Sequence, residues 1–250
     1  MTPHGSFIVS GVERAIVPQL ARSFGAFFVA EETKGKQWFG AKIIPARGVW
    51  IEIESDADGA IYVKIDRKRK FPVTNLLAIM GAGLREELIG KFKGNEAAVR
   101  AIETTLANDT AQTLDEAYVE VHRRMRDGDL ATPDNAKQYV NALFAVDRYD
   151  LSRVGRHRLN MRFGLPTDKK ALDQRALTVD DLVRIVGEIA RLNQDPNAQP
   201  DDIDHLGFRR VRFVVELLQA RMRVGMSRMK RNIQDRMSTI ESETSLPMAF

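Results

Sequence analysis

The most informative absence in this sequence is cysteine. None of its 250 residues is Cys, which excludes a disulfide framework, a thiolate metal site and a cysteine nucleophile, and which fits a reducing compartment. The four histidines, at positions 4, 122, 157 and 205, show no spacing for a nucleophile–base pair or a zinc-binding helix. No run approaches the roughly 18 apolar residues of a membrane span, and residues 1–6 lack the features of a secretory signal. We therefore expect a cytoplasmic chain without a legible catalytic centre.

The composition is otherwise that of a globular protein. Hydrophobic residues make up 44% and charged residues 29%, both near globular averages, and the length allows one large domain or two of ordinary size. The formal net charge is only +4, but its distribution is uneven. Residues 209–236 alone carry +7, so the rest sums to −3; the charges are Arg209, Arg210, Arg212, Arg221, Arg223, Arg228, Lys230, Arg231 and Arg236 against Glu216 and Asp235.

The first quarter of the chain has the pattern of short strands. Runs of branched and aromatic residues separated by Gly, Asp and charged turns predict strands at 6–9, 15–17, 26–30, 41–44, 49–53 and 61–65. The sequence Asp-Ala-Asp-Gly at 56–59 predicts a hairpin turn, because Asp-Gly tolerates the positive φ that such turns require.

After residue 72 the apolar spacing becomes helical. It predicts a helix pair over 76–80 and 84–89 that is broken at Gly81-Ala82-Gly83, followed by helices at 95–107, 114–126, 133–144, 150–163, 178–193 and 211–237. The helix at 211–237 has one apolar stripe. Thr132-Pro133 is a strong start signal for the helix at 133–144. Residues 164–170 and 193–202 are predicted linkers. The expected class is α+β: a β-rich N-terminal part, a mostly helical middle and a long basic C-terminal helix.

Three motifs have a functional and a structural interpretation. Gly81-Ala82-Gly83 follows a helix and lacks Gly-Lys-Ser/Thr, so a helix break is favoured over a phosphate loop. The acidic run 201–205 with His205 lacks the spacing of a metal site, which favours a hydrogen-bonding role. The basic run 67–70 and the arginines of the last helix suit phosphate contact or a solvated face equally well.

Five runs, read together and in order, resemble the β subunit of bacterial DNA-directed RNA polymerase. They are GSFIVSGVER at 5–14 leading to QLARS at 19–23, IIPARGVW at 43–50, IDRKRKFP at 65–72, DRYDLSRVGR at 147–156 and DIDHLGFRRVR at 202–212. The match covers nearly the whole chain to about residue 237.

The resemblance implies a fragment of three parts. Residues 1–25 resemble a segment of the protrusion (β1), residues 26–200 the lobe (β2), and residues 201–250 the return to the protrusion. It further implies no cofactor in this fragment, because the family's catalytic magnesium is held mainly by the β′ subunit. The implied partners are DNA, the β′, α and sigma subunits, and a transcription-repair coupling factor. Nucleotidyl transfer is expected only of the assembled polymerase.

The family's role for this region is to form a wall of the downstream DNA cleft and to contact the non-template strand. The residues that match the family's contacts are Arg22, Trp50, Asp66, Arg67, Ile203, Asp204 and Arg209. We therefore expect Arg22 to lie close to residues 203–209. In the family, these residues form a pocket for an unstacked base of the non-template strand. Phe24, Phe208 and residues 213–215 depart from the family pattern and put the shape of that pocket in doubt. The alternative is a protein-interaction module that docks sigma or coupling factors.

Overall fold

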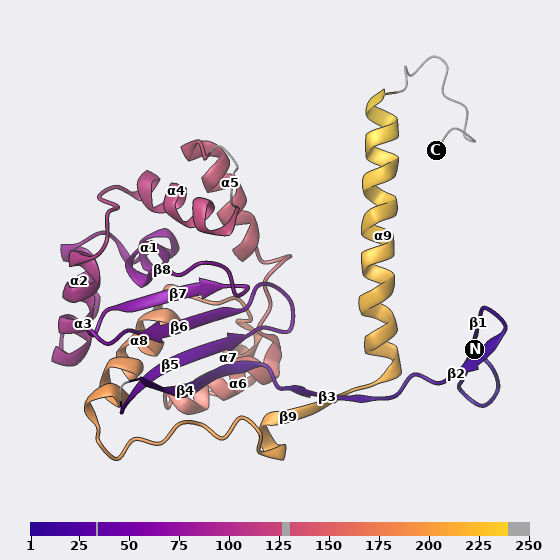
Figure 1. The fold of residues 1–250 in the computed structure, drawn as a ribbon, viewed down its shortest axis with the longest axis horizontal. Coiled ribbons are helices and arrows are strands. Elements are labelled where there is room, and N and C mark those ends of the chain that lie inside the picture. The colour runs from indigo at the N-terminus through magenta and orange to yellow at the C-terminus, as the bar shows by residue number, and fades with distance from the viewer. Residues whose placement is uncertain (34, 127–130, 240–250) are drawn as a thin grey trace. The chain divides into compact units, whose positions relative to one another are not determined.

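The computed structural model describes residues 1–33, 35–126 and 131–239 (Figure 1). The chain forms two compact units. Unit 1 combines residues 1–22 with the chain from Asp204 onward, and unit 2 comprises Ser23–Ile203. These boundaries fall within three residues of the predicted ones at 25/26 and 200/201, while the assignment of the units to protrusion and lobe stays a prediction. Residues 240–250 of the predicted return segment lie outside the described residues.

Unit 2 is built on a five-stranded antiparallel sheet of order β4-β5-β6-β7-β8. The strands are β4 (Gly25–Thr33), β5 (Lys36–Ile44), β6 (Ile51–Ser55), β7 (Ile61–Ile65) and β8 (Phe71–Pro72). Alternation places Ile61, Val63 and Ile65 in the core, as expected for a sheet with one covered face. The predicted hairpin turn is confirmed: Gly59 has a φ of +87°, and the Asp56 amide donates to the Ala60 carbonyl at 2.8 Å.

Helices complete unit 2 (Figure 1). Helix α8 packs on β5, α6 packs on β4, and α3 packs on α8 and β7. Their side chains form one apolar core with the sheet, in which Phe28, Leu76 and Ile185 are buried. The elements are α1 (Val73–Leu77), the π-helix η1 (Ala78–Ala82), α2 (Glu86–Lys91), α3 (Glu96–Ala107), α4 (Leu114–Met125), α5 (Pro133–Phe144), α6 (Ser152–Arg162), α7 (Lys169–Asp173) and α8 (Val179–Gln194).

A buried ion pair joins α6 to the start of α8. The Arg156 side chain is 4% exposed and donates to Asp181 Oδ1 at 2.7 Å. It also donates to the carbonyls of Gln174 and Ala176, while the second Asp181 oxygen accepts from the amide and hydroxyl of Thr178 in a capping box. Each nitrogen of the Arg156 guanidinium and each oxygen of the Asp181 carboxylate therefore makes a hydrogen bond, the condition under which a buried pair is tolerated.

Unit 1 contains two short ladders and one long helix. Strands β1 (Phe7–Val9) and β2 (Val12–Arg14) form a hairpin, and β3 (Gln19–Arg22) pairs antiparallel with β9 (Arg209–Arg212). The 3₁₀ helix η2 (Leu206–Phe208) precedes β9, and α9 (Val214–Thr239) follows it. No helix in the described ranges is long and apolar enough to cross a membrane.

The α+β class and most of the predicted helices are confirmed, with α5 matching its predicted range to the residue. The predicted strand at 15–17 is wrong, since these residues form no ladder and the strand ends at Arg14. The helix predicted over 211–237 begins instead at Val214, because residues 209–212 pair with β3. Helix α7 overlaps the predicted linker at 164–170. The apolar stripe of α9 covers no core among the described residues: Met222 is 68% exposed.

The ion pair between Arg156 and Asp181 supplies a stability prediction. Arg156→Ala leaves the Asp181 carboxylate buried without its cation, so we expect a loss of about 3–5 kcal/mol in the free energy of unfolding. Urea denaturation followed by circular dichroism measures it. The control is Arg153→Ala, which removes an exposed pair with Asp173 and is expected to cost about 0–1 kcal/mol. Equal losses in the two variants would contradict this account.

Candidate functional site

The ladder between β3 and β9 brings together two of the arginines singled out in the sequence. Arg22 lies directly opposite Arg209, and Leu20 lies opposite Val211. Because side chains alternate along a strand, these four residues share one face of the ladder, while Arg210 and Arg212 point from the other. The prediction that Arg22 lies close to the segment before α9 is confirmed for Arg209.

The two faces of this ladder differ in how their charge is balanced. On one, Glu216 accepts from both terminal nitrogens of Arg210 at 2.6 Å and from Arg212 Nε at 3.1 Å. The hydrogen bonds from Arg210, and then from Arg212, hold the pKa of the Glu216 carboxyl below its ordinary value. On the other, Arg22 and Arg209 make no ion pair with any described residue. Like charges placed opposite each other repel.

A second cluster of predicted residues lies in unit 2, where β6 begins and β7 ends. The Asp66 amide donates to the Trp50 carbonyl at 2.9 Å, and the Trp50 amide donates to Asp66 Oδ1 at 2.8 Å. Asp66 and Arg67 both have positive φ, 48° and 59°, a conformation that costs energy for residues other than glycine. This turn places the Arg67 guanidinium 5.9 Å from the centre of the Trp50 ring. Trp50, Asp66 and Arg67 line an open hollow of about 290 Å³.

The basic run after Asp66 is not uniform. The Lys70 ammonium lies 2.6 Å from Asp56 Oδ2 and 4.6 Å from the centre of the Tyr62 ring. The hydrogen bond that Lys70 donates to Asp56 raises the pKa of Lys70. Lys70 is therefore held by unit 2 itself, and Arg67 is the member of the run that stands against an aromatic ring next to a hollow.

The acidic run at 201–205 forms hydrogen bonds within the fold. In unit 2, Asp201 accepts from the Phe28 amide at 2.8 Å and from Arg162 at 3.1 Å. In unit 1, His205 Nδ1 accepts from the Gly207 amide at 3.0 Å at the start of η2. Ile203 belongs to unit 2 and Asp204 to unit 1. In the described ranges no three metal-ligating side chains cluster, so no metal-dependent step is assigned to these residues.

Two of the aromatic residues that depart from the family pattern, Phe24 and Phe208, have local packing roles. Phe24 packs next to Gly155, and a Cβ added to Gly155 would lie 3.2 Å from the Cβ of Phe24. The Phe208 ring lies edge-on to His205 with centroids 6.0 Å apart. Phe213 is exposed at the start of α9.

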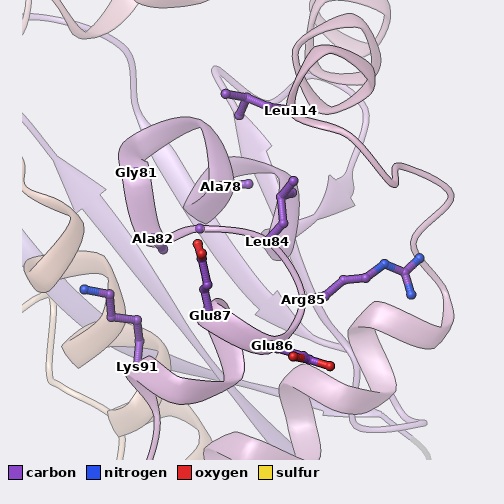
Figure 2. Close-up of a pocket in the computed structure, with 10 residues that line it drawn as sticks. Ala78, Gly81, Ala82, Leu84, Arg85, Glu86, Glu87, Lys91 and Leu114 are labelled. Carbon is purple, nitrogen blue, oxygen red and sulfur yellow. The ribbon is translucent and has the colours of Figure 1, made fainter.

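The glycines at 81 and 83 break a helix, as predicted, since both have positive φ. They line an open cavity of about 890 Å³ together with Arg85, Glu86, Glu87 and Lys91 (Figure 2). Figure 2 shows the Glu87 side chain directed toward the turn at Ala82, and its carboxylate occupies the position that a Cβ on Gly83 would take. A carboxylate at this point repels an anion, which agrees with a helix break and not with a phosphate loop.

Comparison with known proteins places this fold in a family of polymerase subunits. The family model described as RNA polymerase Rpb2, domain 2, matches residues 25–212. Curated relatives named DNA-directed RNA polymerase subunit beta match all of this chain. They include those of Syntrophomonas wolfei (41% identical over 252 residues), Corynebacterium glutamicum (39% over 264 residues) and Bifidobacterium adolescentis (38% over 267 residues). The chain therefore belongs to the family of DNA-directed RNA polymerase beta subunits, which confirms the resemblance. It spans 22% of the length of each of these relatives.

The hydrogen bonds that Glu216 accepts from Arg210 and Arg212 predict a lowered pKa for its carboxyl group. Because its pKa is lowered from the ordinary 4.5, ionised Glu216 contributes stability above that pH, and the contribution is lost as the pH falls through the lowered value. A carbon-13 NMR titration of the carboxyl group should find the Glu216 pKa below 4.5. It should move back toward that value in Arg210→Ala.

The control is Arg221→Ala, which removes an exposed arginine of α9 and is expected to leave the Glu216 titration unchanged. A normal pKa for Glu216 in the unaltered chain, or an equal response to both substitutions, would contradict the assignment.

Proposed function

We propose that this chain works in transcription as part of a DNA-directed RNA polymerase, with unit 2 as the lobe and unit 1 as part of the protrusion. In that assembly it forms a wall of the downstream DNA cleft and contacts the non-template strand. Its partners are DNA and the β′, α and sigma subunits. The magnesium and the chemistry of nucleotidyl transfer belong to the assembled enzyme, and the chain alone is not catalytic.

The observation that carries this proposal is the pairing of Arg22 with Arg209. The ladder holds two guanidinium groups on one face without a carboxylate among the described residues, whereas both arginines on the other face pair with Glu216. Such a pair is stabilised by an anion between or beside the two groups. Arginine also offers the paired donors that fit the O6 and N7 acceptors of guanine.

The Trp50 cluster supports contact with an unpaired strand. An indole ring presents a flat face to a base, and stacking of a base on an aromatic side chain contributes about 1–3 kcal/mol. The hydrogen bonds between Asp66 and the main chain of Trp50 fix the position from which the indole projects. Arg67 adds a positive charge next to the ring for a phosphate of the bound strand. Ile203 and Asp204 complete the proposed contacts, with the Asp204 carboxylate as an acceptor for the N–H edge of a base.

Unit 1 also has a surface suited to protein contact. Ile8, Val12, Val17 and Leu20 are exposed, with Val17 at 71%. Ile8, Val12 and Leu20 lie on β1, β2 and β3, and Val17 lies between β2 and β3. Exposed apolar side chains of this kind favour contact with a protein partner. This favours, as a second role, docking of a protein factor such as sigma or a coupling factor.

Binding to single-stranded DNA tests the first role. We expect Arg22→Ala and Arg209→Ala each to weaken binding of a short guanine-containing oligonucleotide by about fivefold or more at low salt, and to reduce the salt slope by about 1. Trp50→Ala should weaken binding at all salt concentrations, because stacking is not screened. Fluorescence anisotropy across a salt series measures these changes.

The matched control for Arg209→Ala is Arg212→Ala. It makes the same change in the same strand, at an arginine that lies on the other face and pairs with Glu216. We expect it to change the affinity much less. If the oligonucleotide does not bind, or if Arg209→Ala and Arg212→Ala behave alike, the DNA-contact role fails and factor docking becomes the better account.

A further inference from the structure

A polar cavity lies between α4 and α5 in unit 2, two helices that lie side by side (Figure 1). Its volume is about 580 Å³. Its lining comes from successive turns of both helices and from the loop after α5, and consists of His122, Arg126, Asn135, Gln138, Tyr139, Ala142 and Arg148. None of the residues that line this cavity belongs to the proposed DNA contacts.

Among the described residues that line this cavity, two are arginines and none is an aspartate or glutamate. The Arg126 guanidinium lies 4.8 Å from the centre of the Tyr139 ring, which orients it along the cavity wall. Arg148 makes no ion pair with any described residue. Asn135 and Gln138 add amide groups that can donate hydrogen bonds.

A buried histidine lines the same cavity. His122 is 4% exposed, and its Nδ1 has no hydrogen-bond partner among the described residues. Its ring lies edge-on to Tyr139 with centroids 5.2 Å apart. Buried polar nitrogens are nearly always paired, and an exception calls for an explanation. An oxygen acceptor in the cavity would give this nitrogen, as an N–H donor, a hydrogen-bond partner.

The two helices hold this arrangement without a ligand. The Tyr118 hydroxyl donates to Asn141 at 3.0 Å, and Lys137 pairs with Asp115 at 2.7 Å, so side chains cross between α4 and α5 at two levels. Both helices begin with a threonine cap, at Thr113 and Thr132. A site on packed, capped helices is pre-organised, which reduces the entropy lost on binding.

We propose that this cavity binds a phosphate group. Two guanidinium groups, two amides and an imidazole around one hollow match the several oxygen acceptors and the negative charge of a phosphate. The group can belong to a free phosphate compound or to the backbone of a nucleic-acid strand. The proposal uses none of the residues of the proposed DNA contacts and stands independently of them.

The test compares two probes on the full chain. Inorganic phosphate and a short single-stranded oligonucleotide without terminal phosphates are titrated separately, with side-chain N–H signals of arginine followed by NMR. The oligonucleotide arm uses a background of Arg22→Ala, Arg209→Ala, Trp50→Ala and Arg67→Ala, so that the proposed arginine, stacking and phosphate contacts do not contribute. We expect at least one probe to shift the Arg148 signal in a saturable way. Saturation by inorganic phosphate identifies a site for free phosphate compounds, and saturation by the oligonucleotide alone identifies a strand site.

Arg148→Gln is the decisive variant, because this side chain is exposed and its loss should not unfold the chain. We expect it to weaken binding of the probe at least about fivefold, measured through the signal of Arg126, which lines the same cavity and is retained in this variant. The control is Arg123→Gln, an exposed arginine of α4 that pairs with Glu120 and does not line the cavity. His122→Phe, which keeps a ring against Tyr139, should also weaken binding. The proposal is overturned if neither probe saturates the Arg148 signal, or if Arg148→Gln and Arg123→Gln bind equally well.

Discussion

The pairing of β3 with β9 is the constraint on which the organisation of the chain depends. The two strands are separated in sequence by all of unit 2, yet Arg22 lies opposite Arg209 and Gln19 opposite Arg212. The ladder joins the point at which the chain leaves unit 1 to the point at which it returns. Unit 2 is therefore an inserted domain with its ends held close together, and the same register decides which arginines share a face.

The chain uses arginine in two physically different ways. Arg156 is buried, and Asp181 with two carbonyls satisfies its donors, so it serves the fold of unit 2. Arg210 and Arg212 both pair with the single carboxylate of Glu216. Arg22 and Arg209 have no such partner in the part of the chain that the structure describes. Residues whose charge the fold leaves unbalanced are the better candidates for contact with an anion, and the overall charge of +4 does not reveal them.

Sequence patterns predicted what local interactions decide. The turn at 56–59 and the start of α5 at Thr132-Pro133 follow from the backbone preferences of a few adjacent residues. The strand at 209–212 could not be found this way, because three of its four residues are arginine and its partner lies in the first 22 residues. The proximity of Arg22 and Arg209 came from the family resemblance alone. The unpartnered nitrogen of His122 and the ion pair of Arg156 were not predicted, since both depend on packing between distant segments.

The register of β3 and β9 can be measured directly, because the chain has no native cysteine. Leu20→Cys combined with Val211→Cys places two thiols at directly opposite positions, where Cα atoms are about 4.5–5.5 Å apart, within the range of a disulfide. Leu20→Cys with Phe213→Cys offsets them by two residues and is the control. Mild oxidation should cross-link the first pair within one chain, faster and more completely than the second. Equal or absent cross-linking in the two variants would contradict the pairing, and with it the placement of Arg22 beside Arg209.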